Sequence, residues 1–222
     1  MNAKKLAAEK AITFVKDGMT VGLGTGSTAS FAIEAIGKLV VQGLSIKAVA
    51  SSLKSEELAR KNGIQLIPFS KELSIDIYID GADEVDQHWN LLKGRGGALL
   101  REKIIAFNSK IFIVIVDSSK LVDHLGKIPL PVEVATFAHE LTRKHLEESG
   151  CTTTIRQENN LPFKTDNGNM IIDCAFNKIT EIDKLSEKIK AIPGVVENGL
   201  FSKFMVSKLI VGYENGNVTV QE

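Results

Sequence analysis

The run from Lys110 to Asp117 restricts the possible folds of this chain more than any other segment. Between its two charged ends, the six residues Ile111 to Val116 are all apolar. A strand with one solvated face alternates apolar and polar residues, whereas a strand buried on both faces is apolar throughout. We therefore expect this run to be an inner strand of a sheet that has helices on both faces, as in parallel α/β folds.

Apolar strand patterns and helical patterns alternate along the first half of the chain. An amphipathic helix comes first, and Gly18 follows it as a suitable helix end. Strands that alternate with helices predict an α/β fold with a doubly wound, mostly parallel sheet. The expected strands are residues 20–23, 46–50, 64–67 and 75–79, and the next expected helices are residues 29–39 and 55–62.

The pattern changes near Pro129 and Pro131, where we expect a smaller α+β domain to be inserted before the C-terminal strands. Its predicted order is βαββαβ, the ferredoxin-like arrangement. We predict an α/β catalytic domain at residues 1–126 plus 203–222, which a C-terminal hairpin rejoins, and a smaller domain at residues 127–202. The smaller domain is expected to have strands at 132–134, 151–157 and 170–176, helices at 135–149 and 181–191, and a short strand before Gly199.

The charge balance excludes some classes of partner. Lys plus Arg and Asp plus Glu both number 27, so no net field attracts nucleic acid or an anionic membrane.

No segment approaches the roughly 20 apolar residues that span a bilayer, and the N-terminal residues do not have the pattern of a signal peptide. Cys151 and Cys174 have no CxxC spacing, so they indicate neither a disulfide framework nor a zinc site. We expect a cytoplasmic protein.

A glycine-rich turn, Gly24 to Thr28, lies between a predicted strand and a predicted helix. Such a turn can direct backbone N–H groups and hydroxyls at a phosphate. It equally fits a tight turn with helix caps at Thr25 or Ser27. A dinucleotide site fits poorly, because the third glycine of GxGxxG would stand at position 27, which is Ser27. If the turn binds an anion, a small phosphate ester suits it better than a nucleotide.

An acidic turn, Asp80 to Glu84, follows the strand predicted at residues 75–79. Ligands of open α/β sheets bind at the carboxyl ends of strands. Asp80 and Asp83 are spaced to accept hydroxyl hydrogen bonds from one polyol and to transfer a proton during ring opening. A solvated acidic turn is the alternative. A metal site with Asp86 and His88 is disfavoured, since the spacing does not match an EF-hand.

A basic glycine loop, Lys93 to Lys103, leads into a further predicted helix. Sugar isomerisation needs a base for a carbon-bound proton and a cation near the enediolate oxygen. Glu102 and Lys93 have the residue types for these two roles. Taken alone, the loop is also explained by ordinary helix capping with Glu102 in the first turn. Lys120, just after the apolar strand, either faces the ligand or is a surface lysine.

These segments together resemble the type A ribose-5-phosphate isomerases along essentially the whole chain. The resemblance implies an aldose–ketose isomerase of the non-oxidative pentose phosphate pathway, a homodimer or homotetramer, and no metal or organic cofactor. Residues 202–208 depart from the family, whose members usually carry an Ala-Asp pair there. The matching segments are Val21–Thr28, Asp80–Glu84, Lys93–Lys103, Gly126–Val134 and Ile192–Phe201.

The resemblance also assigns roles to residues. Glu102 would shuttle a proton between C1 and C2 of ribose 5-phosphate or ribulose 5-phosphate. Asp80, Asp83 and Lys93 would complete the catalytic set, and Lys120 would help to bind the sugar phosphate. Either the glycine-rich turn or the lysines would hold the phosphate. The remaining substrate-binding residues would be Thr25, Gly26, Ser27, Thr28, Gly81, Ala82, Gly94, Arg95 and Gly96.

Two other functions are compatible with parts of this pattern. Sensor domains of sugar-responsive transcription regulators resemble this fold, and fold alone does not separate them from enzymes. The combination of Glu102 with Asp80, Asp83 and Lys93 favours the enzyme, as does the lack of a helix-turn-helix before the domain. A metal-dependent isomerase that uses the acidic turn is the second alternative.

Overall fold

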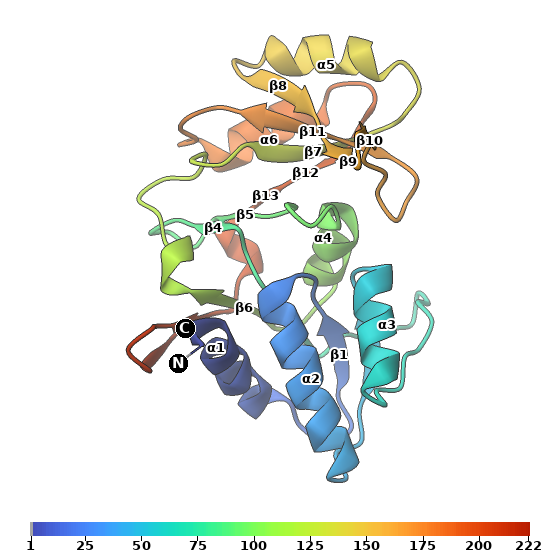
Figure 1. The fold of residues 1–222 in the computed structure, drawn as a ribbon, viewed down its shortest axis with the longest axis vertical. Helices are drawn as coiled ribbons and strands as arrows, with labels where there is room; N and C mark the ends of the chain where they lie inside the picture. Colours follow the sequence, from blue (N-terminus) through green and yellow to red (C-terminus); the bar gives the residue numbers. More distant parts are fainter. Residues whose placement is uncertain (1) are drawn as a thin grey trace. The chain divides into compact units, whose positions relative to one another are not determined.

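The computed structural model describes residues 2–222, which form two compact units. The first unit consists of the chain up to Ala82 together with Arg101–Lys120 and Phe204–Glu222. The second consists of Asp83–Leu100 and Leu121–Lys203. Figure 1 traces the chain through both units, which are described one at a time below.

The first unit contains a six-stranded sheet with the order β15-β14-β6-β3-β1-β2. All neighbours are parallel except the terminal hairpin of β14 and β15. The apolar run of the sequence forms β6, an inner strand between β3 and β14, as predicted. The strands are β1 (Thr20–Leu23), β2 (Lys47–Ala50), β3 (Ile77–Asp80), β6 (Phe112–Asp117), β14 (Lys208–Gly212) and β15 (Val218–Gln221).

Helices lie on both faces of this sheet. Alternate residues of a buried strand point to opposite faces, so one strand packs against helices on both sides. On one face, Ile77 and Ile79 of β3 share a core with Ala7 and Ile33 from the first two helices, which lie side by side (Figure 1). On the other face, Tyr78 lies close to Ile105. The helices are α1 (Ala3–Ala11), α2 (Ser27–Val41), α3 (Leu53–Lys61) and α4 (Leu99–Phe107).

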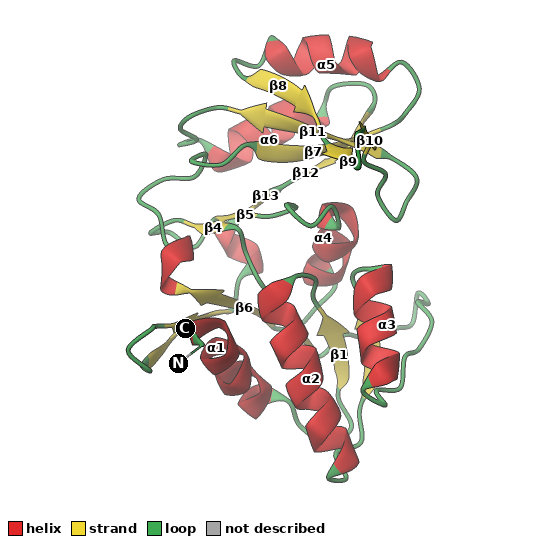
Figure 2. Ribbon diagram, viewed as in Figure 1, coloured by secondary structure: helices red, strands yellow, loops and turns green. Residues whose placement is uncertain are grey.

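The second unit contains the predicted βαββαβ order, folded as an antiparallel sheet β12-β7-β11-β8. Leu146 and Ile189 of its two helices pack with Val132 and Ile172 in one core, so both helices cover the same face (Figure 2). The elements are β7 (Leu130–Val134), α5 (His139–Glu147), β8 (Thr152–Ile155), β11 (Met170–Ala175), α6 (Ile182–Lys190) and β12 (Val195–Asn198).

Small strands complete the second unit. They form a three-stranded sheet of β4 (Glu84–Val85), β5 (Leu91–Leu92) and β13 (Leu200–Phe201), and a hairpin of β9 (Gln157–Glu158) and β10 (Leu161–Pro162). Because β5 pairs with β13, residues 83–100 belong to the second compact unit, whereas the predicted division assigned them to the first domain. The predicted fold class, a mostly parallel sheet with an inserted α+β region, is confirmed.

Two predicted elements differ from the structure, and one observed hairpin was not predicted. Residues 64–67 form no strand, because they make only a single bridge, from Leu66 to Ala48 at the edge of the sheet. The helix predicted from residue 135 begins at His139, because Ala138 has a left-handed backbone with φ of 51°. The hairpin of β9 and β10 was not predicted.

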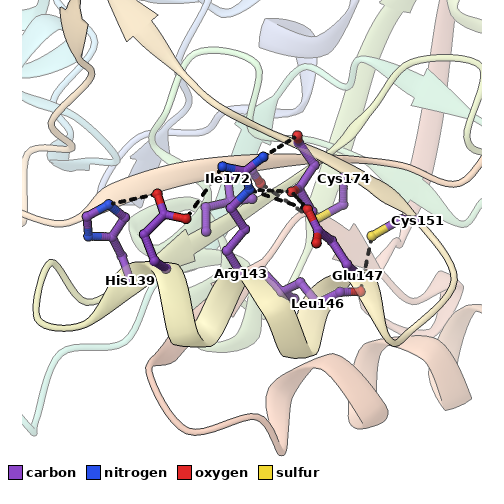
Figure 3. A network of polar contacts seen from close by, with 9 residues as sticks. His139, Arg143, Leu146, Glu147, Cys151, Ile172 and Cys174 are labelled. Carbon is purple, nitrogen blue, oxygen red and sulfur yellow. Dashed lines mark hydrogen bonds and ion pairs between the residues drawn. The ribbon is translucent and has the colours of Figure 1, made fainter.

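Cys151 and Cys174 are buried free cysteines in the second unit (Figure 3). The Cys151 thiol donates to the carbonyl of Leu146 over 3.2 Å. The hydrogen bond with Cys151, together with burial, raises the pKa of the Cys174 thiol far above its ordinary value. Both thiols therefore serve as small packing groups. Among residues 2–222, no helix is both long enough and apolar enough to cross a bilayer.

Candidate active site

The Asp80 carboxylate at the end of β3 is fully buried and has a donor on each of its oxygens. Its Oδ1 accepts the backbone N–H groups of Thr25 at 2.9 Å and Gly81 at 2.7 Å. Its Oδ2 accepts the Tyr78 hydroxyl at 2.5 Å. Backbone amides around a glycine turn favour an anion. Here, the anion that meets the Thr25 amide is a carboxylate of the protein itself.

Gly24 brings the glycine-rich turn against this carboxylate. A Cβ atom at position 24 would lie 2.1 Å from Oδ1 of Asp80 and 2.6 Å from its Cα, so no larger residue fits. The Gly24 amide also donates to the carbonyl of Ile79 over 3.0 Å. The glycine at this position is therefore explained by contact with Asp80 rather than by contact with a ligand.

The Thr25 hydroxyl is also occupied inside the first unit. It lies 2.7 Å from the Ser51 hydroxyl and donates to that of Ser52 over 2.9 Å. Ser55 closes the group by donating to the carbonyl of Gly24 over 2.6 Å. Sequence reasoning did not assign Ser51, Ser52 or Ser55 to the site. The available signal was their position directly after β2, at the same edge of the sheet as the glycine-rich turn.

Helix α2 begins immediately after the turn, and its N-cap is Gly26, which has a φ of 105° and supplies no side-chain cap. Helix caps by the side chains of Thr25 or Ser27, the alternative considered from the sequence, are therefore wrong. The first N–H groups of a helix have no partner within the helix, so they favour an anion. Ser27, the first residue of α2, accepts a hydrogen bond from the Lys4 ammonium over 3.0 Å.

Lys4 and Lys120 both line a cavity of about 430 Å³ in the first unit. Lys4 lies in the first turns of α1, and Lys120 ends the 3₁₀ turn that follows β6. Ser118 and Ser119 from that turn also line the cavity. The sequence did not predict Lys4 as a site residue, because the pattern of an N-terminal amphipathic helix does not indicate a contact between Lys4 and Ser27.

Glu102 lies in the first turn of α4 and is only 3% exposed. This burial does not fit a solvated helix-capping residue. Burial first, and then the negative charges of Asp80 and Glu102, raise the pKa of the Tyr78 hydroxyl well above its ordinary value. Tyr78 is therefore a permanent hydrogen-bond donor that lies close to two carboxylates.

The second unit holds the other predicted residues. Asp83 accepts the backbone N–H of Arg95 through Oδ2 at 2.9 Å, which ties the acidic turn to the basic glycine loop. Lys93 is 3% exposed, and its ammonium lies 5.5 Å from the centre of the Phe201 ring. Gly94 has a φ of 102°, a backbone conformation that favours glycine. Ala82, at the end of the first segment of the first unit, lies within the acidic turn, and Gly96 follows Arg95 in the loop.

Glu84 of the acidic turn and Asp86, two residues after the turn, have structural partners. Glu84 is buried and accepts the backbone N–H groups of Gly126 and Ile128, both at 2.8 Å. Asp86 accepts the N–H groups of His88 and Asn90, both at 2.8 Å, and so shapes its own loop. Over residues 2–222, no group of three or more His, Cys, Asp or Glu side chains is placed to hold a metal ion.

Comparison with known proteins identifies the family. The family model of ribose 5-phosphate isomerase A (phosphoriboisomerase A) matches residues 47–216. Over 217 residues, the chain is 51% identical to ribose-5-phosphate isomerase A of Bacillus mycoides (strain KBAB4), which covers 97% of this chain and 98% of the relative. The chain belongs to the ribose 5-phosphate isomerase A family.

Solved isomerases have the same fold over the same length. The ribose 5-phosphate isomerase A of Methanocaldococcus jannaschii is 41% identical with a TM-score of 0.94, over 100% of this chain and 98% of that one. A D-ribose-5-phosphate isomerase in complex with phospho-erythronic acid is 38% identical with a TM-score of 0.94, over 100% of both chains. The resemblance inferred from the sequence motifs is confirmed.

The structure gives a physical reason for several motifs of the isomerase family. Gly24 is next to Asp80, Asp83 is bonded to Arg95, and Glu84 is bonded to the segment that begins at Gly126. Residues 202–208 include a short 3₁₀ turn, Lys203–Met205, before β14. The Ser207 hydroxyl there accepts the N–H of Phe112 over 3.0 Å, so this segment anchors the start of β6.

Proposed function

We propose that this chain interconverts D-ribose 5-phosphate and D-ribulose 5-phosphate through an enediolate, with Glu102 as the base. The observation that carries the proposal is the buried Glu102 carboxylate in α4, acting on the same phenol that binds Asp80 at the carboxyl end of β3. Ligands of open α/β sheets bind at this end of the strands. Membership of the isomerase family supplies the substrate.

In this mechanism, the Glu102 carboxylate removes the proton on C2 of the open-chain aldose while the negative charge moves to O1. The same carboxyl group then returns the proton to C1, the proton of the O2 hydroxyl passes to O1, and O2 becomes the carbonyl of ribulose 5-phosphate. One base is sufficient, because C1 and C2 are adjacent. On the basis of the family resemblance, we assign the stabilisation of the charge on the enediolate oxygens to the Lys93 ammonium.

Ring opening comes first and needs a group that exchanges a proton with the sugar hydroxyl. Asp80 accepts three hydrogen bonds and is fully buried, so we assign it an electrostatic and anchoring part. Asp83 is half-buried, and we assign the proton transfer of ring opening to it. Phospho-erythronic acid, bound by the solved relative, has a carboxylate at C1 and so resembles the charge distribution of an enediolate.

Either the glycine-rich turn or the lysines could hold the phosphate, and we propose that both do. Ser27 and the N-terminal turn of α2 supply hydrogen-bond donors, and Lys4 is already bonded to Ser27. Lys120 lines the same cavity as Lys4. We expect Lys4→Ala to raise KM for ribose 5-phosphate about tenfold, since a charged hydrogen bond contributes about 1.5–3 kcal/mol. Lys5→Ala, half-exposed in the ion pair with Glu9, is the matched control and should leave KM unchanged.

The test of the function is a direct assay with chelator-treated protein, ribose 5-phosphate and no added nucleotide. We expect ribulose 5-phosphate to form, and Glu102→Gln to lower kcat at least about 10²-fold. Glu57→Gln on the surface of α3 is the matched control. Absence of turnover by the wild-type chain, with ribose 5-phosphate still raising Tm, would contradict the isomerase and favour a sugar sensor.

The assembly and the location of the chain stay predictions. We propose a homodimer or homotetramer in the cytoplasm, in accordance with the family resemblance and with C2 symmetry being the commonest arrangement. Static light scattering at assay concentration measures the mass, and a monomer would contradict the assembly. We also propose that turnover needs no metal or organic cofactor, which the chelator-treated assay tests.

A further inference from the structure

Tyr78 is a fully buried tyrosine in the middle of β3, and its ring is held on both sides. The ring stacks on Phe112 of β6 with 4.9 Å between ring centres. On the side of β1, Gly22 makes room, because a Cβ atom there would lie 2.7 Å from the Tyr78 ring and 2.8 Å from Ile105 of α4. The phenol is therefore fixed in one position.

The Tyr78 hydroxyl is the centre of a polar group within this apolar surrounding. It donates to Oδ2 of Asp80 at 2.5 Å. The Ser51 hydroxyl and the negative charge of the Glu102 carboxylate also act on the phenol. The titratable groups that act on the phenol are thus Asp80 and Glu102, whereas Phe112 and Ile105 present only apolar atoms.

This bond determines how freely Asp80 can move. Charged hydrogen bonds in a site of low dielectric are strong and mutually reinforcing. On its other oxygen, Asp80 receives the amides of Thr25 and Gly81. Loss of the Tyr78 donor would let the carboxylate rotate, which would loosen both the glycine-rich turn and the acidic turn.

We infer that Tyr78 is a positioning residue for the isomerisation, whose hydroxyl fixes the orientation of the Asp80 carboxylate at the carboxyl end of β3. This inference rests on the proposed function. The phenol does not exchange a proton with the substrate in this role. It holds the Asp80 carboxylate in one orientation, so that the glycine-rich turn, which Asp80 binds through the Thr25 amide, keeps its position. The raised pKa of the phenol agrees with a donor that is present over the whole range of assay pH.

The decisive variant is Tyr78→Phe, which keeps the ring and its stacking on Phe112 but removes the donor. We expect kcat to fall about 10- to 100-fold, as for the loss of a hydrogen bond to a charged group, while KM changes less than about threefold. Tyr213→Phe, at the only other tyrosine, is the matched control and should change neither quantity.

A purely structural role is distinguished by Phe112→Leu. That variant removes the stacked ring but keeps the hydroxyl, so we expect a lower Tm with kcat within about twofold of wild type. The inference is overturned if Tyr78→Phe retains wild-type kcat, or if Phe112→Leu lowers kcat equally. Both outcomes leave the proposed function standing, since wild-type turnover is measured in the same series. An inactive wild-type chain would refute the proposed function and this inference together.

Discussion

Asp80 of the first unit and Glu133 of the second are both fully buried carboxylates on strands, but their partners differ. Asp80 uses both oxygens and binds two backbone amides and a phenol. Glu133 of β7 uses only Oε1, which accepts the side chains of three residues in one turn. Its Oε2 has no hydrogen bond within residues 2–222. The three donors are Thr165, Asn167 and Asn169.

The difference teaches that burial of an acid does not by itself mark an active site. Both carboxylates organise a loop, and both would be costly to leave unpaired. The two carboxylates differ in their titratable neighbours. The Tyr78 phenol that binds Asp80 is also under the influence of the Glu102 charge. We therefore expect Asp80 to act on the reaction and Glu133 to act on stability alone, and three predictions test this.

The largest effect is expected for Asp80→Asn. The amide has nearly the same shape, but it removes the charge and presents N–H atoms to a site that already contains three donors. We expect kcat to fall at least about 10²-fold, as measured by ribulose 5-phosphate formation. Circular dichroism should show a folded chain. An active Asp80→Asn variant would contradict the distinction between the two carboxylates.

Glu133→Ala should give the opposite result. Removal of the acceptor leaves Thr165, Asn167 and Asn169 without their shared partner, so the free energy of unfolding should fall by about 2–4 kcal/mol. Urea unfolding measures this change. At a temperature where the variant is folded, kcat should remain within about twofold of wild type. A loss of kcat with unchanged stability would reverse the assignment.

The smallest effect is expected at Asp76, a partly exposed carboxylate that precedes β3. Its hydrogen bonds with the Lys110 ammonium and the Thr20 amide lower its pKa below the ordinary 3.8. Each of these two effects on the pKa is larger than the opposite effect of burial. A lowered pKa in the folded state means that the stabilisation is present above pH 3.8 and is lost as pH falls through the lower, folded value. Asp76→Asn should therefore cost about 0.5–1 kcal/mol at pH 7 and almost nothing near pH 2.

Urea unfolding of wild type and Asp76→Asn at both pH values checks this sign. Lys110→Ala is the matched variant, because it removes the first cause of the shift and should show the same dependence on pH. A difference that grows as the pH falls would contradict the lowered pKa. Turnover should not change in either variant, in contrast to Asp80→Asn at the end of β3.

The parts of the fold that are determined by local pattern could be predicted from the sequence. The apolar run of β6 required burial on both faces, and the prolines at 129 and 131 indicated the beginning of the second pattern. Residues 64–67 have the apolar pattern of a strand, but they meet the sheet through a single bridge. Tertiary contacts, not local preference, determined the secondary structure of that segment.

The same distinction between local pattern and tertiary contact applies to the site. Asp80, Asp83, Lys93 and Glu102 could be named because they lie in short motifs of suitable chemistry. The contact of Lys4 with Ser27 joins positions 23 residues apart, and no periodicity predicts it. Tyr78 alternates with isoleucines in β3, so its sequence context indicated only a strand. Its position between Gly22, Phe112 and Ile105 becomes visible only when three strands and a helix are assembled.

The contact between Gly24 and Asp80 has a consequence for which anions the first turn of this sheet can accept. The position where many α/β proteins place a pyrophosphate already contains a fixed negative charge, 2.9 Å from the Thr25 amide. A second anion at the same amide would be repelled in a medium of low dielectric, where like charges interact strongly. An anion can still bind at the start of α2, beyond Gly26. The fixed charge of Asp80 thus disfavours a pyrophosphate at the Thr25 amide.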